Sequence, residues 1–340
     1  MIPIVQHSDL APFVASAAVI LEQSLRKGNA AFGDAKFWLT TQIASHLQLN
    51  SPQVKIVDSG TAGLIASLLH LRYASTANKN KTRVLVPNIS YAATRTAILH
   101  AGLEPVYVTT DTTGAIDFDA LDAADTTDVL AVMPVVLWGH GLDWGRLCDW
   151  SAMHRIPVVL DAAQAWGTDI PAWIDYTVYS LSANKPWPTF NTLGVVVTRE
   201  PETAGFNRVL SHAAGHYFAG TRGYAAEDAC AQAIATWEAA HNWAERRRKF
   251  SYRILGSLGD MHVVAPATAS RSANWHKLVL RITSQQALDI AMQDVECKQA
   301  YTYYLDNCNL GPSFYQVPNR GTLTDAEQEH IAQTLLNVLG

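Results

Sequence analysis

The sequence predicts an α/β protein with a mostly parallel sheet that helices cover on both faces. Between residues 54 and 198, short apolar runs alternate with stretches of helical periodicity. Several of these runs are apolar at successive positions, which is typical of strands buried inside a parallel sheet. The 340 residues, of which 49% are hydrophobic, can bury a large core. We therefore expect a large domain over residues 1–245, beginning with a helical segment, and a small α+β domain over residues 246–340.

The individual elements follow from local patterns. The strands expected in the large domain are residues 54–57, 83–87, 105–108, 129–135, 157–161, 176–180 and 194–198. Residues 225–255 are rich in Ala and contain neither Gly nor Pro, so they predict one long helix that leads toward the small domain. In that domain, residues 277–282 predict a strand, and Ser284 marks a helix start. Thr324, followed three residues later by Glu327, fits the capping box of a final helix.

Charge, cysteine content and the N-terminal residues narrow the class of protein. The net charge is −5, and the basic run Arg246-Arg247-Arg248-Lys249 predicts a solvated helix face rather than a nucleic-acid patch. The four cysteines have no metal-ligand spacing, and we expect them to be reduced. No signal peptide pattern and no apolar run of about 18 residues occur, so we expect a cytoplasmic protein without membrane contact.

Asp161 and Lys185 carry the strongest chemical signal. Asp161 ends an apolar strand, where an unpaired carboxylate would be costly to bury, so it predicts a cationic partner or, alternatively, an N-cap on a helix beginning at Ala162. Lys185 lies between small polar residues and Pro186, which predicts a loop position, although most lysines are solvated surface groups. Pyridoxal phosphate (PLP) chemistry requires a lysine amine for a Schiff base and a carboxylate that keeps the pyridine nitrogen protonated. The pair therefore predicts a PLP site.

Three further segments could complete such a site. Ser59-Gly60-Thr61 joins a strand to a helix, where backbone N–H groups and a hydroxyl could bind a phosphate, or where Ser and Gly could simply form a turn and cap. Tyr91 follows a strand end and could stack on a flat cofactor or pack over a helix start. Gln164 could contact the ring hydroxyl or complete a cap at Asp161.

The order of these motifs resembles one known family. Residues 59–62, 86–94 and 161–167, and then Ser180 five residues before Lys185, follow the pattern of the DegT/StrS sugar aminotransferases, which are fold-type I PLP enzymes. Residues 134–140, 245–248 and 323–327 resemble further family segments, so the similarity covers nearly the entire chain. The resemblance implies the PLP-dependent transferase fold of type I. That fold has a seven-stranded, mostly parallel sheet and a small C-terminal α+β domain, and it forms a homodimer with active sites at the subunit boundary.

The same resemblance assigns roles to the residues of the large, PLP-binding domain. Lys185 would form the Schiff base and move the proton during transamination. Asp161 would pair with the pyridinium nitrogen, Gln164 would contact the ring oxygen, and Tyr91 would stack on the ring. The phosphate would be held by Gly60, Thr61 and Ser180.

The chain also departs from the family pattern. After the lysine, the family reads Asn-Leu-Gly and then a Gly-Glu-Gly-Gly turn, whereas residues 186–194 read Pro-Trp-Pro-Thr-Phe-Asn-Thr-Leu-Gly. Residues 220–227 replace a partner-subunit segment with the sequence Asn-Tyr-Arg-Met-Ser-Glu, and Arg222 would take over the phosphate contact of its Asn. Val136 replaces a strand His, and residues 301–304 lack the usual pattern on the acceptor side.

The function implied by the resemblance is amino transfer. The donor would be glutamate or glutamine, and the acceptor a nucleotide-linked keto-sugar or a related cyclitol ketone. Two alternatives remain open at this point: a sugar dehydratase or other lyase that uses the same cofactor, and a non-catalytic relative that acts as a binding subunit. The presence of Lys185 favours transamination over dehydration, since dehydrating relatives lose this lysine.

Overall fold

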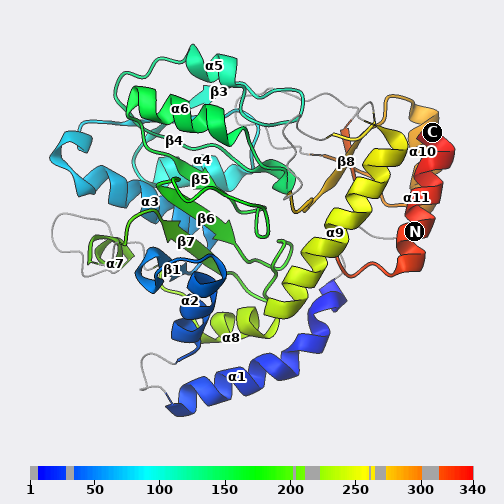
Figure 1. Cartoon of the computed structure of the whole chain (residues 1–340), viewed down its shortest axis with the longest axis horizontal. Coiled ribbons are helices and arrows are strands. Elements are labelled where there is room, and N and C mark those ends of the chain that lie inside the picture. The colour runs from blue at the N-terminus through cyan, green and yellow to red at the C-terminus, as the bar shows by residue number, and fades with distance from the viewer. Residues whose placement is uncertain are drawn as a thin grey trace.

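The computed structural model describes residues 7–27, 34–201, 204–210, 223–259, 262–264, 273–300 and 314–339. In these residues a large sheet with helices on both faces lies beside a small antiparallel sheet with its own helices (Figure 1). The predicted α/β class is therefore confirmed. Among the described helices, none is long and apolar enough to cross a membrane.

The large sheet has the topology expected of a mostly parallel sheet. Its described strands lie in the order β3-β2-β4-β5-β6-β7-β1, where bridges at Val132–Val158 and Val135–Asp161 join β4 to β5. Their bounds are β1 (Val54–Val57), β2 (Arg83–Pro87), β3 (Glu104–Val108), β4 (Val129–Val132), β5 (Val159–Asp161), β6 (Tyr176–Ser180) and β7 (Gly194–Thr198). Of these strands, β7 runs antiparallel to both its neighbours, and the other pairs are parallel. The predicted strand over residues 129–135 is shorter than expected, because regular pairing with β2 ends at Val132.

Helices pack on both faces of this sheet. One face carries α3 (Gly60–Ala74), α4 (Ala92–His100) and α7 (Ala204–Leu210); the other carries α2 (Ala35–His46), α5 (Phe118–Asp122), α6 (Trp144–His154) and α8 (Glu227–Ala235). Successive strand residues face opposite layers: Val84 and Val86 contact the α3 and α4 side, whereas Leu85 contacts the α2 and α6 side. Because both layers exclude water, the strands read as continuous apolar runs.

The helical stretch predicted over residues 225–255 is two helices rather than one. α8 ends at Ala235, and α9 (Trp237–Leu258) begins after Thr236. The Thr236 hydroxyl lies 3.1 Å from the carbonyls of Gln232 and Pro188 and accepts a 3.1 Å bond from Trp187 Nε1. These side-chain bonds compete with the helical backbone pattern and fix the break. α9 is continuous through residue 245, so the domain boundary expected there stays a prediction.

The basic run in α9 is not the solvated face that the sequence predicts. Arg247 is buried, with 5% of its surface exposed. Arg246 donates to the carbonyls of Gly321 and Leu323, and Arg248 donates to two other carbonyls, so both tie α9 to neighbouring segments. Only Lys249, of these four residues, keeps a mostly exposed side chain. Hydrophobic periodicity could not reveal this, because the aliphatic stem of an arginine packs like an apolar group.

The C-terminal part has its own core. β8 (Leu278–Arg281), β10 (Phe314–Val317) and β9 (Lys298–Gln299) form an antiparallel sheet in that order, packed against α9, α10 (Gln285–Asp294) and α11 (Asp325–Leu339). Ser284 caps α10 as predicted. The capping box is confirmed as well, since Glu327 Oε2 accepts from Thr324 N at 2.8 Å and Thr324 Oγ1 accepts from Glu327 N at 3.2 Å.

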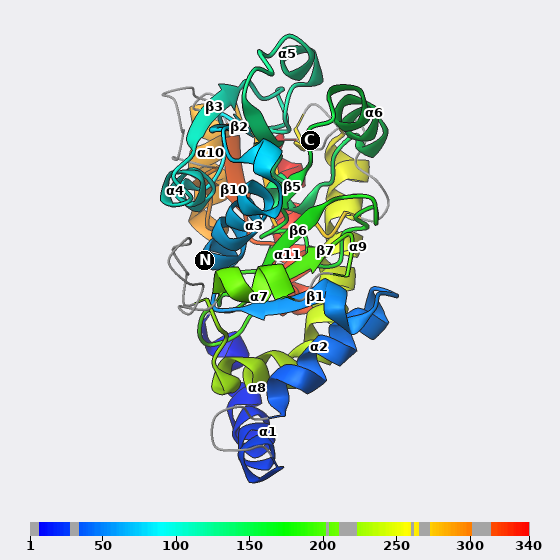
Figure 2. The ribbon, with the colours of Figure 1, turned by 90° about the vertical axis from the view of Figure 1, so that its left-hand side faces the viewer.

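The N-terminal segment lies against both parts of the molecule. Asp9, in the 3₁₀ segment η1 (His7–Phe13), reaches the loop before α11, and α1 (Val14–Lys27) packs along α8 (Figure 2). Short 3₁₀ turns η2 (Ser51–Gln53), η3 (Thr76–Asn78) and η4 (Leu137–Gly139) complete the described elements. A cluster that includes Val135, Trp138, Val279 and Phe314 joins the carboxyl ends of the large-sheet strands to the small sheet. Ligands of open α/β sheets bind at this edge.

Candidate active site

A cavity of about 370 Å³ opens at the carboxyl ends of β1, β2, β5 and β6, beneath the small sheet. Seven residues singled out from the sequence line it together: Gly60, Thr61, Tyr91, Asp161, Gln164, Ser180 and Lys185. They come from four separate loops, and the parallel strand order gathers them at one edge. Arg222, the eighth, lies outside the described residues, as do the departures noted at residues 301–304.

The N-terminus of α3 forms one wall of this cavity. Ser59 caps the helix by accepting a 3.1 Å bond from Ala62 N. A Cβ on Gly60 would stand 2.9 Å from Ser180 Cβ, closer than real side chains approach, so the position admits glycine alone without a shift. The close approach sets the helix N-terminus beside the hydroxyls of Thr61 and Ser180. Free N–H groups, a positive helix end and two hydroxyls form a site suited to a phosphate.

Asp161 lies at the floor of the cavity, with 5% of its surface exposed. Its Oδ2 accepts from Thr94 Oγ1 at 2.8 Å, and its Oδ1 accepts from Ala163 N at 3.1 Å. Residues 162–168 form turns, so the alternative of a helix beginning at Ala162 is wrong. Burial raises the pKa of Asp161, while the two hydrogen bonds and the charge of Lys185 oppose the rise.

Lys185 is half-buried and faces the same cavity from the loop after β6. Its backbone N–H donates to the Ser182 carbonyl at 2.9 Å, which holds the loop in a tight turn. Burial lowers the pKa of the Lys185 amine, and the nearby Asp161 charge opposes this shift. The Nζ atom lies 5.6 Å from the centre of the Tyr91 ring. A lowered amine pKa favours the neutral nucleophile that carbonyl chemistry needs.

Tyr91 and Gln164 bound the cavity from opposite loops. The Tyr91 side chain is 50% exposed and precedes α4, so its ring stands open to the cavity rather than packed in the core. Gln164 is buried, and its Oε1 accepts a 3.0 Å bond from the backbone N–H of Trp138. This bond fixes the side-chain amide of Gln164 in place. Because no helix begins at Ala162, the alternative that Gln164 completes a helix cap there is wrong.

The unusual loop after Lys185 is anchored in the core. Trp187 is fully buried, and its Nε1 donates to the Ala233 carbonyl and to Thr236 Oγ1, both at 3.1 Å. Its ring centre lies 4.5 Å from that of Trp166. Trp187 belongs to the segment that departs from the family pattern, and its two hydrogen bonds attach the lysine loop to the junction between α8 and α9.

Sequence reasoning missed the residues that the small sheet contributes. His276, Lys277, Lys298 and Gln316 line the cavity opposite α3. Lys277 Nζ donates to Gln316 Oε1 at 2.8 Å, and burial together with the positive charge of Lys185 lowers the pKa of Lys277 to about 8. Burial and the surrounding cations also lower the pKa of His276 well below its usual range, so that ring is neutral. No motif marks these residues, because they reach the site only through the packing of two sheets.

The residues present fit the PLP group predicted from the sequence. Among the described residues, neutral donors alone bond to the Asp161 carboxylate, so an aromatic N–H⁺ would be the cation it lacks. The glycine cradle at α3 suits a phosphate, and Lys185 lies in the same cavity.

Comparisons with known proteins agree with this geometry. The family model for the DegT/DnrJ/EryC1/StrS aminotransferases matches residues 17–337. A relative from Streptomyces venezuelae, dTDP-3-amino-3,4,6-trideoxy-alpha-D-glucose transaminase, is 28% identical over 258 residues, which cover 72% of this chain and 68% of the relative.

Two solved structures share the fold. One is a DegT/DnrJ/EryC1/StrS aminotransferase from Brucella abortus, with a TM-score of 0.86, 18% identity and full coverage of both chains. The other is NtdA from Bacillus subtilis with bound pyridoxamine phosphate, with a TM-score of 0.83, 18% identity and coverage of 99% of this chain and 85% of that one. The chain therefore belongs to the DegT/DnrJ/EryC1/StrS aminotransferase family of PLP-dependent enzymes.

Proposed function

We propose that this aminotransferase moves an amino group from glutamate or glutamine to the ketone of a sugar, nucleotide-linked or free, or of a cyclitol. The observation that carries the proposal is the placement of Lys185 and buried Asp161 around one cavity that also holds an anion cradle at Gly60. The sugar acceptor is supported by the Streptomyces venezuelae relative, whose name describes a transaminase of a nucleotide-linked sugar.

Each residue has a separate task in this proposal. When bound, PLP supplies an electron sink that stabilises the carbanion formed when the substrate loses a proton. Asp161 holds the proton on the pyridine nitrogen, and Thr94 holds Asp161. Lys185 would hold the cofactor covalently in the resting enzyme, and its amine, once released, would take up and return the proton that leaves the substrate's α-carbon. Its lowered pKa suits this work, because the amine must be neutral when it accepts the proton.

The remaining residues position the cofactor. Gly60 N–H, Thr61 and Ser180 would hold the phosphate, Tyr91 would stack on the ring, and Gln164 would contact the ring oxygen. Since donor and acceptor share one cofactor, they must occupy the cavity in turn, which is a ping-pong cycle.

We further propose a homodimer in which Arg222 reaches the phosphate of the partner's site. Large apolar side chains on α1 are exposed: Val14 at 54%, Val19 at 53% and Leu25 at 59%. An amphipathic helix that exposes such groups is typical of an interface. Analytical ultracentrifugation checks the dimer, and an Arg222→Ala variant with unchanged PLP affinity would contradict the assigned phosphate contact.

Absorbance spectra of the purified protein with PLP test the core of the proposal. The wild type should show a band near about 400 to 430 nm that moves toward about 330 nm when glutamate or glutamine is added. Lys185→Ala should lose the first band. Lys277→Ala is the matched control, because this second lysine also lines the cavity, and it should keep the band.

The other outcomes separate the alternatives. A band that ignores both donors would leave a PLP site but point to lyase chemistry or to a different donor. A protein that binds no PLP would support the non-catalytic binding subunit. Once amino transfer from the donor is measured, keto-sugars with and without a nucleotide can be compared as acceptors by release of the aminated product.

A further inference from the structure

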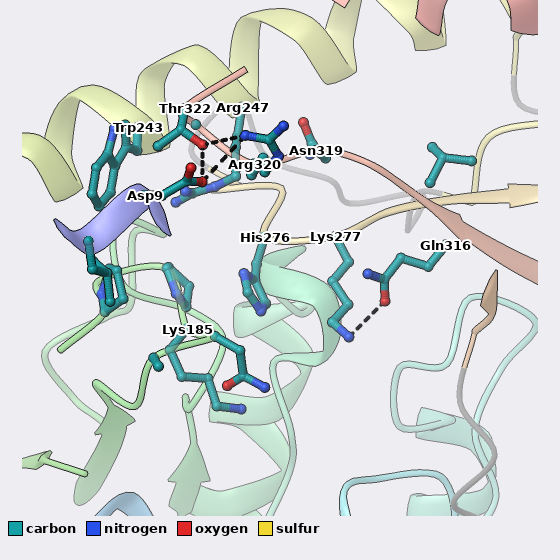
Figure 3. A pocket seen from close by; sticks show the side chains of 17 residues that line it. Asp9, Lys185, Trp243, Arg247, His276, Lys277, Gln316, Asn319, Arg320 and Thr322 are labelled. Carbon is teal, nitrogen blue, oxygen red and sulfur yellow. Dashed lines mark hydrogen bonds and ion pairs between the residues drawn. The ribbon is translucent and has the colours of Figure 1, made fainter. Parts of the chain in front are cut away.

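A second, smaller cavity of about 130 Å³ adjoins the PLP cavity on the side of the small sheet (Figure 3). The two cavities share five lining residues: Asn184, Lys185, His276, Lys277 and Gln316. The rest of its wall comes from the loop that carries Lys185, from η1, from α9, from the end of β10 and from the loop that precedes α11. Figure 3 shows Lys185 toward one end and Arg247 of α9 toward the other, with His276 between them.

Arg247 is a buried cation in this wall, and no carboxylate of the described residues forms an ion pair with it. Its side chain lies on the inner face of α9, with 5% of the residue exposed. In the described part of the chain, its Nε and Nη2 atoms have no hydrogen-bond partner. Burial and the adjacent Arg248 lower the pKa of Arg247 to about 9, so the guanidinium is still charged at neutral pH. Two orphan donors on a buried charge are costly unless an anion binds them.

Asp9, a carboxylate that lines this cavity, is already bonded to other residues. Asp9 accepts bonds from Thr322 Oγ1 and from Arg320 Nη1, and Arg320 also pairs with Glu327 at 3.2 Å. Asp9 therefore balances Arg320 rather than Arg247. Lys185 and Lys277 add positive charge on the opposite side of the same cavity. Most of the charged side chains that line the cavity are therefore positive, and among the described residues no anion is bonded to Arg247.

The shape and size of the cavity select the anion. The Nε and Nη2 atoms form the edge of the guanidinium that binds a planar carboxylate through two parallel bonds. Pockets for drug-sized ligands measure roughly 300 to 1,000 Å³, so about 130 Å³ suits a carboxylate on a short chain and excludes a nucleotide. An α-amino acid that spans the cavity would bring its amine to Lys185.

We propose that Arg247 binds a carboxylate of the amino donor and thereby directs the donor's amine toward Lys185. This inference rests on the proposed aminotransferase function and adds the residue that selects the donor. A sugar or cyclitol acceptor without a carboxylate would use the larger cavity and leave Arg247 without a role.

The test uses PLP-loaded protein and glutarate, a five-carbon dicarboxylate that lacks the amine. Calorimetry should give a Kd for glutarate that rises on the order of 10- to 100-fold in Arg247→Met. Lys249→Met is the matched control, since it removes a positive charge from the exposed side of α9 and should leave the Kd unchanged. Arg247→Lys keeps the charge but loses the two-bond geometry, and it should lie between the two.

Further readouts separate binding from folding and from the function itself. Without glutarate, Arg247→Met should unfold at the same or a higher temperature than the wild type, because it removes an uncompensated buried charge. Glutarate affinity that is unchanged in Arg247→Met would overturn the proposal, and so would a site that binds inorganic phosphate in preference to glutarate. The absorbance shift with glutamate reports the aminotransferase function separately, so its success together with unchanged glutarate binding would refute the role of Arg247 alone.

Discussion

Thr94 donates a 2.8 Å hydrogen bond from its Oγ1 atom to Oδ2 of Asp161, and both residues are buried. The same hydroxyl lies 2.6 Å from Ser90 Oγ, so a short polar chain runs from the end of β2 to the end of β5. Thr94 lies in the first turn of α4, two residues after Ala92, where the helix begins. The helix therefore positions the carboxylate that would hold the pyridinium, and it does so without adding a charge.

Replacing Thr94 with Val should weaken cofactor binding. The variant keeps the shape of the side chain but removes the hydroxyl, which leaves Asp161 with one hydrogen bond fewer and raises its pKa further. A hydrogen bond to a charged group contributes about 1.5 to 3 kcal/mol, so we expect PLP affinity to fall at least about 10-fold in a fluorescence titration. Thr94→Ser retains the hydroxyl and serves as the control. Equal affinity in Thr94→Val and the wild type would argue against a role for this bond.

Asp161→Asn should separate stability from function. In the apoprotein the carboxylate is buried without a cation in contact, so its charge opposes folding; Asn has the same size and no charge. We expect the apo variant to unfold at a higher temperature than the apo wild type at pH 7. With PLP present, the order should reverse, since only the wild type gains the pyridinium contact.

The pH dependence gives this prediction a definite sign. Burial raises the pKa of Asp161 in the folded state above its unfolded value of 3.8, so the folded protein binds more protons within that interval. The stability of the apo wild type should therefore fall, relative to Asp161→Asn, as pH rises from 3.8 through the folded-state pKa, and the gap should stay constant above it. Thermal unfolding of both apoproteins between about pH 4 and pH 8 measures the gap. A gap that narrows as pH rises through that interval would contradict the sign.

Local patterns identified most of the fold because they reflect local physics. The strands at residues 54–57, 83–87, 176–180 and 194–198 have the predicted bounds, since each is an apolar run buried between two helical layers. The predictions failed where tertiary contacts decide. Thr236 breaks the long helix through bonds to a loop nearly 50 residues earlier, and Arg247 is buried by segments that the helix meets only in three dimensions.

The candidate site likewise contains residues that local patterns predict and residues that only tertiary contacts bring into place. Lys185, Asp161 and Gly60 each sit at a strand end, so the parallel sheet alone brings them together, and their order along the chain is informative. His276 and Lys277 come from the small sheet, whose position depends on the apolar cluster around Trp138 and Val279. Neither residue carries a local signal beyond a strand-like run.

Gly60→Ala should damage the phosphate cradle. The new Cβ would stand 2.9 Å from Ser180 Cβ, so α3 or β6 must move, at a cost of about 1 to 3 kcal/mol. PLP affinity should fall as well, because the shift displaces the helix N-terminus.

Gly256→Ala is the matched control for Gly60→Ala. No atom lies within 4 Å of its Cβ position inside α9, and the change should stabilise the protein by about 0.5 to 1 kcal/mol. Urea unfolding and PLP titration of both variants check this. Destabilisation by both changes, or by neither, would show that the contact with Ser180 is unimportant.

Trp187→Phe should loosen the loop that carries Lys185. The variant keeps an aromatic ring in the core but loses the two Nε1 bonds to Ala233 and Thr236. Trp150→Phe makes the same change at another buried tryptophan, whose Nε1 has no hydrogen-bond partner among the described residues. The difference between the two variants therefore isolates the hydrogen bonds, and Trp187→Phe should have a free energy of unfolding lower by about 1 kcal/mol or more.

The kinetic consequence of Trp187→Phe distinguishes an anchor of the site from an ordinary core residue. Lys185 lies two residues before Trp187, and its proton transfer depends on geometry held within fractions of an ångström. Stopped-flow measurement of the glutamate half-reaction should therefore show a slower step in Trp187→Phe at saturating glutamate, with PLP still bound, and an unchanged step in Trp150→Phe. If both variants react at the wild-type rate while Trp187→Phe is less stable, Trp187 supports the core and leaves the position of the lysine unaffected.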